Sequence, residues 1–131
     1  MKHEELTKKI IHCFFTVYNQ LGYGFLESVY KKAMLIEERK QGLLVETEVP
    51  ICVYYDEQIV GEFSADQIVE SVVIVEFKAA RTMLPEHEAQ LLNYLNSTNC
   101  EVGLLFNFGP QAQFKRKVFD NDKKRYRAQK L

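Results

Sequence analysis

Several features are missing from this sequence, and each absence excludes a class of protein. Its 131 residues contain no internal repeat, no low-complexity segment and no proline- or serine-rich linker, so we expect one domain. The N-terminal residues do not form a basic stretch followed by an apolar run, which argues against a secretory signal. The most apolar early stretch, residues 10–26, includes a histidine, an asparagine, a glutamine and two glycines, and is therefore unsuited to span a membrane.

Cysteine is also scarce. The three cysteines, Cys13, Cys52 and Cys100, lie far apart and have no C-x-x-C spacing. They predict neither a disulfide framework nor a zinc site. A reducing, cytoplasmic location is the resulting expectation.

The charged residues are present in ordinary amount but unevenly distributed. With 47% hydrophobic and 27% charged residues, the chain is not intrinsically disordered, and its formal net charge is only −1. Residues 111–131, however, contain eight Lys or Arg and two Asp. Such a basic end indicates either a polyanionic partner such as nucleic acid or a solvated terminal charge run, and composition leaves both open.

Hydrophobic periodicity predicts an α/β fold. Apolar residues at three- and four-residue spacings indicate helices over residues 4–20, 25–41 and 86–96. Stretches rich in Val, Ile and Tyr, or apolar throughout, indicate strands over residues 43–55, 59–69, 72–79, 101–108 and 113–119. This order predicts a central mixed sheet flanked by helices within residues 1–120, followed by a basic tail over residues 121–131.

The strand expected over residues 72–79 carries the most informative side chains. Both of its faces are apolar, which is typical of a central strand covered on both sides, yet one face ends in Glu76 and Lys78. A chain reversal near Ser71 places Asp66 of the preceding strand opposite Glu76. Two carboxylates so close repel each other unless a proton or a cation lies between them.

A divalent cation with oxygen ligands resolves this conflict. Mg²⁺ is the preferred ion because it takes one or two carboxylates, keeps several waters and accepts a substrate phosphate. Lys78 beside such a metal would orient or deprotonate an attacking water. The alternative is an inert ion pair between Lys78 and Glu76 or Asp66, with no metal and no catalysis, and spacing alone leaves both open.

Two helices add polar candidates. On the helix expected near residues 86–96, His87, Gln90 and Tyr94 share one face, which either lines a cleft or lies in solvent. Glu27 lies in the first turn of the preceding helix, where an acid is also expected simply because it complements the helix dipole.

The residues Gly24-Phe25-Leu26-Glu27-Ser28-Val29-Tyr30 match a Gly-x-x-Glu-x-x-Tyr signature. The likeness continues through Val49-Pro50, Tyr54-Tyr55, Ala65-Asp66, Val75 to Ala79, His87 to Leu95 and Gly103 to Gly109. Over about residues 5–110 the chain thus resembles the small GxxExxY protein family, which is placed in the PD-(D/E)XK nuclease superfamily. The resemblance implies a restriction-endonuclease-like α-β-β-β-α-β core with an extra N-terminal helix, and a PD-(D/E)XK-like domain over residues 1–120.

The resemblance also implies roles for individual residues. The metal-binding acids and the active-site lysine of the superfamily pattern fall on Asp66, Glu76 and Lys78. Glu27 matches the acid of the first helix of the core, and Gln90 matches a glutamine often found on the later helix. Ala65 stands where the superfamily's name has proline.

The leading hypothesis is therefore a Mg²⁺-dependent nuclease, with Mn²⁺ as a second option, that cleaves DNA or RNA. Its metal ligands would be Asp66, Glu76, the Phe77 carbonyl and Glu27, the last directly or through water. Substrate positioning is expected from His87, Tyr94, Lys115, Arg116 and Lys117, and phosphate contacts of this kind weaken as salt rises. The alternative is a catalytically silent module that binds nucleic acid or protein. A homodimer or a protein partner is expected in either case, because so small a domain has little surface for target recognition.

Overall fold

The computed structural model describes residues 1–124. Their helices are α1 (Glu4–Leu21), α2 (Glu27–Lys40), α3 (Pro85–Asn96) and the 3-10 turn η1 (Asn121–Lys123). Their strands are β1 (Val45–Tyr55), β2 (Gln58–Val69), β3 (Val73–Lys78), β4 (Val102–Phe108) and β5 (Ala112–Val118). The element order is the predicted one, and Pro85 opens α3, where a missing N–H costs no helix hydrogen bond.

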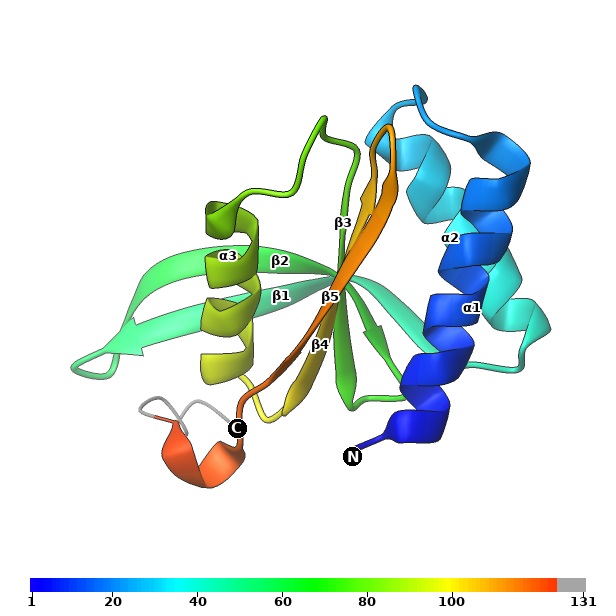
Figure 1. Cartoon of the computed structure of the whole chain (residues 1–131). Coiled ribbons are helices and arrows are strands. Elements are labelled where there is room, and N and C mark those ends of the chain that lie inside the picture. The colour runs from blue at the N-terminus through cyan, green and yellow to red at the C-terminus, as the bar shows by residue number, and fades with distance from the viewer. Residues whose placement is uncertain (125–131) are drawn as a thin grey trace.

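The strands form a five-stranded sheet in the order β1-β2-β3-β4-β5 (Figure 1). Strands β1, β2 and β3 are a meander of antiparallel neighbours, β4 runs parallel to β3, and β5 returns antiparallel to β4. The parallel return after α3 follows because a helical crossover brings the chain back to the same edge of the sheet. The prediction of a mixed sheet flanked by helices is confirmed.

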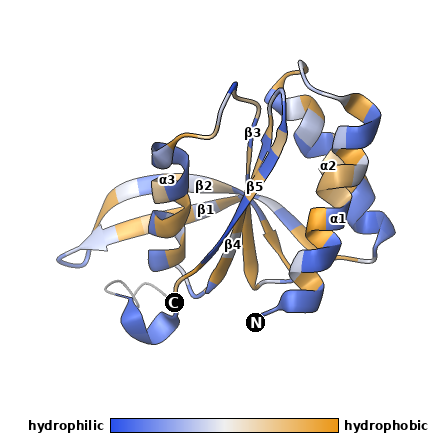
Figure 2. Ribbon diagram, viewed as in Figure 1, coloured by the Kyte–Doolittle hydropathy of each residue, from blue (hydrophilic) through white to orange (hydrophobic). Residues whose placement is uncertain are grey.

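Helices cover both faces of this sheet. Figure 1 shows α1 and α2 on one side and α3 on the other, and Figure 2 shows hydrophobic residues along the strands between them. The side chains of Val73, Val75 and Phe77 pack in the core under α1 and α2, whereas Ile74 packs in the core under α3. Successive side chains of a strand point to opposite faces, so the sequence of β3 predicts that its apolar residues divide between the two cores.

Helix α3 packs directly on the backbone of β4 at Gly103. A Cβ built at this glycine would lie 2.7 Å from Leu91 Cδ1, closer than two carbon atoms approach without displacement. The absence of a side chain at Gly103 therefore sets how closely α3 approaches the sheet.

A polar pair is buried between α2 and β2. Glu38 has no exposed surface, and its Oε1 accepts a hydrogen bond of 2.7 Å from Gln67 Nε2. Burial raises the pKa of Glu38 to about 7, although the Gln67 bond opposes the change. Cys13 of α1 lies nearby, and burial, followed by the charge of Glu38, raises the pKa of its thiol to about 11. This thiol is therefore protonated and unreactive at neutral pH.

The residues after β5 begin by packing on the domain. Lys124 is buried, and its Nζ donates to the carbonyl oxygens of Thr98 and Cys100 at 3.0 and 2.6 Å. The first residues of the predicted tail thus touch the body of the protein, whereas residues 125–131 lie outside the described part of the chain. Within residues 1–124, no helix combines the length and the hydropathy that a membrane crossing requires.

Candidate active site

Two acidic side chains lie at the point where β2 separates from β3. Main-chain pairing of these strands ends at Gln67 and Val75, and Asp66 and Glu76 are the next residues in the same register. Their side chains take over the hydrogen bonding: Asp66 N–H donates to Glu76 Oε2 and Phe77 N–H donates to Asp66 Oδ2, both at 2.8 Å. Each carboxylate is therefore held by the backbone of the neighbouring strand, so both are oriented before any ligand arrives.

The separation of the strands coincides with an irregularity in β1. Glu48 has a φ of 50°, a left-handed conformation that non-glycine residues rarely adopt. It lies between the β1–β2 pairs Thr47–Gln67 and Val49–Ala65, and thus across from Asp66. Strained backbone of this kind is enriched at functional sites. Beyond it, the outer half of the β1–β2 hairpin extends past α3 (Figure 1).

Glu76 lies in an environment that disfavours its charge. Only 4% of its surface is exposed, and burial raises its pKa to about 8, with the Asp66 carboxylate contributing to the same effect. The positive charges of Lys78 and Lys31 oppose the change. Without an additional cation Glu76 is therefore mostly protonated at pH 7, and a cation near it would favour the carboxylate.

A lysine that the sequence analysis did not select lies against the site. Lys31 of α2 places its Nζ 2.8 Å from Asp66 Oδ1, 3.5 Å from Glu27 Oε2 and 3.6 Å from Glu48 Oε2. Burial alone would lower the pKa of Lys31, but its hydrogen bond to Asp66 and the neighbouring carboxylates raise it. Lys31 is thus a permanent cation that neutralises Asp66 and joins three acids from α2, β1 and β2. Its position four residues after Glu27 was the only local signal for this role.

The predicted metal ligands supply oxygen atoms of the kind that Mg²⁺ prefers. Asp66 and Glu76 offer two buried carboxylates, and the carbonyl of Phe77 lies on the backbone between Glu76 and Lys78. Glu27 is directed to Lys31 instead, and 41% of its side chain is exposed. Among residues 1–124, no three His, Cys, Asp or Glu side chains are grouped closely enough to bind an ion without other ligands. Water and substrate oxygens would have to complete the coordination, as is usual for Mg²⁺.

The segment after Lys78 is fixed by a buried asparagine that the sequence analysis missed. Lys78 pairs with Asn107 across the parallel strands β3 and β4. The Asn107 side chain accepts from Ala80 N–H at 2.9 Å and donates to Ala80 carbonyl at 3.0 Å. Both bonds fix the chain two residues beyond Lys78. A polar residue inside the apolar run of β4 was the available signal, because a fully buried amide must be hydrogen-bonded.

The three polar candidates on α3 differ in their surroundings. Tyr94 is buried, and burial raises the pKa of its phenol, with the charges of Glu76 and Asp66 contributing. Tyr94 and half-buried Gln90 line the same cavity. His87 faces the start of α3, where its Nδ1 accepts from Leu84 N–H at 3.1 Å and stabilises the first turn. The structure therefore brings Tyr94 near the acids and gives His87 a structural contact.

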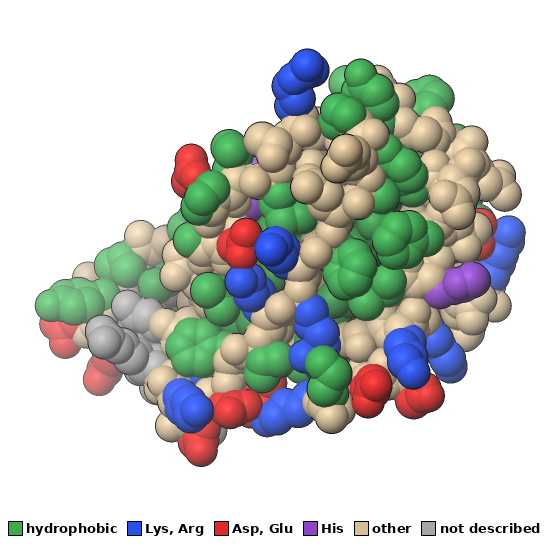
Figure 3. Space-filling view, viewed as in Figure 1, with side chains coloured by type: hydrophobic (Ala, Val, Ile, Leu, Met, Phe, Trp, Pro, Cys, Tyr) green, Lys and Arg blue, Asp and Glu red, His purple; other side chains and the backbone are tan. Residues whose placement is uncertain are grey.

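The basic residues of β5 are partly engaged within the protein. Lys115 lies in the same cross-strand row as Glu76, with Leu105 of β4 between them. Lys117 forms an ion pair of 2.7 Å with Glu88 of α3, and Arg116 donates to the carbonyl of Lys2. Figure 3 shows lysine and arginine side chains across the middle of this face with acidic side chains beside several of them. Lys115 is accordingly the best placed of the three to contact a phosphate at the acids.

The family of this chain is identified by its similarity to known protein families. A family model described as the PD-(D/E)XK nuclease superfamily matches residues 4–118, which is most of the chain. The chain belongs to the PD-(D/E)XK nuclease superfamily. Glu76-Phe77-Lys78 and Asp66, whose N–H donates to Glu76, lie within the matched residues.

A solved structure supports the PD-(D/E)XK fold. The chain is similar to a protein described as "Crystal structure of SSO0001", with a TM-score of 0.50 and 16% sequence identity. The similarity covers 71% of this chain and 50% of that protein, so the chain spans half of its length. At this identity the likeness shows a shared fold alone, and the superfamily assignment comes from the family model. A search of curated proteins found no match.

The tyrosine of the Gly-x-x-Glu-x-x-Tyr motif has a structural role in this PD-(D/E)XK domain. Tyr30 is fully buried, and its hydroxyl donates to Gly22 carbonyl at 2.7 Å and accepts from Phe25 N–H at 3.2 Å. Its ring stacks on Phe108 with the centroids 4.2 Å apart. These contacts fix the connection between α1 and α2, and with it the start of the helix that carries Glu27 and Lys31.

Proposed function

We propose that this protein is a metal-dependent nuclease of the GxxExxY type that hydrolyses phosphodiester bonds in nucleic acid. The observation that supports this most directly is the pair of reciprocal hydrogen bonds between Asp66, Glu76 and the Phe77 backbone, with Lys78 next along β3. A purely structural ion pair does not require two carboxylates to be buried side by side, since that arrangement costs free energy unless a cation compensates it.

Each residue of the site would contribute a distinct step. Asp66, Glu76 and the Phe77 carbonyl would hold Mg²⁺ or Mn²⁺, with Glu27 contributing through water. When bound, the cation supplies charge stabilisation at the phosphate and lowers the pKa of a nearby water. Lys78 would orient that water and take part in its deprotonation. Asn107 pairs with Lys78 across β3 and β4 and fixes the chain two residues beyond it, at Ala80. Gln90 and Tyr94 position the substrate from α3.

The nuclease proposal is tested by cleavage assays on single- and double-stranded DNA and RNA with Mg²⁺ or Mn²⁺. We expect metal-dependent cleavage that Glu76→Gln and Lys78→Ala both abolish. Glu62→Gln on β2 and Lys9→Ala on α1 are matched controls, because both side chains are exposed outside the site. A wild-type protein that cleaves no better than Glu76→Gln under all conditions would overturn the proposal.

One observation favours a second candidate, the catalytically silent module. Lys31 already neutralises Asp66 at 2.8 Å, so the acids are partly compensated without any metal. In that case wild-type protein and Glu76→Gln would bind nucleic acid equally and neither would cleave it. Calorimetric titration with Mn²⁺ separates the candidates further. A nuclease should bind the ion in a manner that Glu76→Gln weakens, whereas a silent module should show no such dependence on Glu76.

A further inference from the structure

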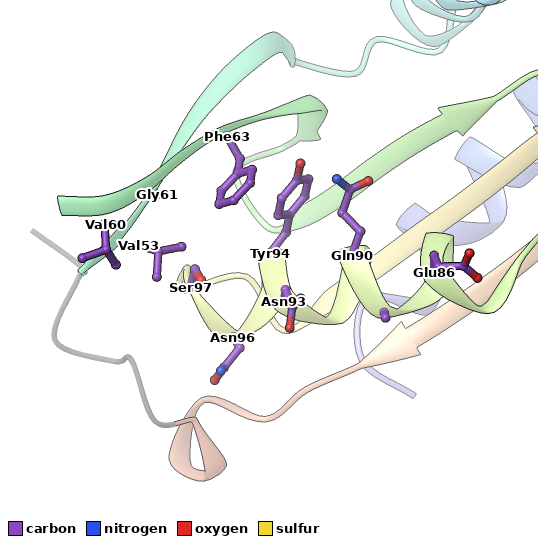
Figure 4. A pocket seen from close by; sticks show the side chains of 11 residues that line it. Val53, Val60, Gly61, Phe63, Glu86, Gln90, Asn93, Tyr94, Asn96 and Ser97 are labelled. Carbon is purple, nitrogen blue, oxygen red and sulfur yellow. The ribbon is translucent and has the colours of Figure 1, made fainter. Parts of the chain in front are cut away.

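A cavity of about 550 Å³ lies between the outer half of the β1–β2 hairpin and α3. Figure 4 shows Tyr94 and Gln90 projecting from α3 toward the strands, with the Phe63 ring of β2 beside Tyr94. The ring centroids of Phe63 and Tyr94 are 5.9 Å apart. Phe63 is 47% exposed although it borders a hollow, so part of its side chain is accessible to a ligand.

The polar and aromatic side chains of the cavity wall are mainly rings and amides, and the described lining residues include no Lys or Arg. Besides the two rings, the wall contains the side-chain amides of Gln90, Asn93 and Asn96. Glu86 is the charged residue among the described lining residues, and it is negative. This composition repels phosphate but suits a flat, uncharged heterocycle that stacks on a ring and exchanges hydrogen bonds along its edge.

Two features tie the cavity to the candidate active site. Tyr94 lines the cavity and is also close enough to Glu76 and Asp66 for their charges to act on its phenol. At the acids, by contrast, the side chains include cations: Lys31 lies 2.8 Å from Asp66, Lys78 follows Glu76 on β3, and Lys115 lies in the cross-strand row of Glu76. The charges thus favour a phosphate at the acids and an uncharged ring in the cavity.

The backbone of the hairpin keeps the Phe63 ring in place. A Cβ built at Gly61 would lie 2.9 Å from Phe63 Cε2, so the ring lies directly against a residue without a side chain. Contact with Gly61, which also belongs to the cavity wall, thus holds one edge of the ring at the cavity.

We infer that this cavity binds an unpaired nucleobase of the substrate strand, stacked on Phe63, next to the phosphate that is cleaved. This inference rests on the proposed nuclease function and specifies its substrate class. A base inside a duplex is stacked on both faces and paired along its edge, so only an unpaired or extruded base offers both its face and its edge to the cavity. Single-stranded regions, ends or flaps are the corresponding substrates.

The test measures binding of a short labelled oligonucleotide to the Glu76→Gln protein, which is not expected to cleave it. Three probes are compared: an intact single strand, the same strand with abasic sites in its centre, and the duplex. We expect the intact strand to bind about 10-fold more tightly than the abasic strand, in the range measured for single base–aromatic stacks. Phe63→Ala should weaken binding of the intact strand by a similar factor and leave the abasic strand unaffected.

Matched variants keep this test independent of folding. Phe63→Leu retains apolar volume on β2 but removes the aromatic face, and it should behave as Phe63→Ala does. Phe114→Ala on β5 removes a ring that is 38% exposed and outside the cavity, and it should bind all probes as the parent does. Equal affinity for the intact and abasic strands, or equal weakening of both by the Phe63 variants, would overturn the inference.

Failure of the inference is distinguishable from failure of the proposed function. Metal-dependent cleavage that is equally fast on duplex, intact and abasic strands would leave the nuclease proposal standing and overturn the base site. Base-dependent binding through Phe63 in a protein that never cleaves would support the base site and overturn the nuclease proposal.

Discussion

The backbone N–H of Asp66 donates a 2.8 Å hydrogen bond to Glu76 Oε2, where main-chain pairing between β2 and β3 stops. A side chain thus completes the contact between two strands that have begun to separate. The same carboxyl group that we assign to metal binding therefore also stabilises the sheet. A change that keeps this acceptor but cannot ionise, such as Glu76→Gln, should therefore abolish the proposed activity while it raises stability at high pH.

Glu76→Gln should stabilise the metal-free protein at high pH. The folded-state pKa of Glu76 is about 8 against an ordinary value of 4.5, so wild-type stability falls as pH rises from about 4.5 to 8, where folding favours the protonated form. Glutamine keeps the acceptor for Asp66 N–H and cannot ionise. Urea denaturation in EDTA at pH 9 should show a gain of roughly 1 to 3 kcal/mol, absent at pH 4.5. A gain that is the same at both pH values, or one shared by Glu62→Gln, would contradict this explanation.

Lys31→Met should destabilise the protein at neutral pH. The substitution leaves the Asp66 carboxylate, 9% exposed, without the ammonium that lies 2.8 Å away. Loss of a partner from a buried ion pair costs about 1 to 3 kcal/mol. Millimolar Mg²⁺ should recover part of this loss, because it neutralises the same carboxylate. Thermal or urea unfolding with and without Mg²⁺ measures both effects, with Lys9→Met, at an exposed position on α1, as the control that should change neither.

Glu38→Gln should reduce the pH dependence of stability. The pKa of Glu38 is raised from 4.5 to about 7, so the wild-type protein loses stability between about pH 4.5 and 7, where the group ionises in the unfolded state but keeps its proton when buried. The variant should lose about 1 to 2 kcal/mol less over that interval. Measuring both proteins in a Glu76→Gln background removes the overlapping titration of Glu76. Parallel stability curves for the two proteins would show that burial does not raise the pKa of Glu38 above its value in the unfolded chain.

Tyr30→Phe should lower stability without changing the chemistry of the site. The variant keeps the ring stacked on Phe108 but removes the hydroxyl that bridges Gly22 and Phe25. The expected cost is about 1 to 2 kcal/mol in urea unfolding, since the Gly22 carbonyl loses its hydrogen-bond donor. The cleavage rate per folded molecule should be unchanged, and Tyr23→Phe, whose side chain is exposed, serves as the control. A rate that falls more than the folded fraction would give Tyr30 a role in the chemistry.

The sequence predicts this fold well where the relevant pattern is local. The side chains of Val73, Ile74 and Val75 point to alternate faces of the strand and are all apolar. This is sufficient to identify a central strand that is covered on both faces. The register of Asp66 against Glu76 depends on a short turn, in which Glu70 and Ser71 have φ angles of 53° and 62°. A reversal only a few residues long leaves little freedom in the pairing of the strands that flank it.

The parts of the site that sequence reasoning missed depend on contacts between distant segments. Lys31 meets Asp66 only because α2 packs over β2, and nothing in the pattern of α2 states which strand lies beneath it. The left-handed conformation of Glu48 is likewise imposed by tertiary structure, since glutamate has no intrinsic preference for it. Buried Lys124 shows the same limit, because a basic run has the composition of a solvated tail until its environment is known.

Leu91 lies against Gly103 on the side of α3 that faces the sheet, so the packing there affects the position of the whole helix, including Gln90 and Tyr94. One added methyl group at Gly103 would require the Leu91 side chain of this helix to move. The catalysis proposed for this protein, which draws on Gln90 and Tyr94 of the same helix, would therefore be open to weakening from inside the hydrophobic core, by a substitution that leaves every charge of the molecule unaltered.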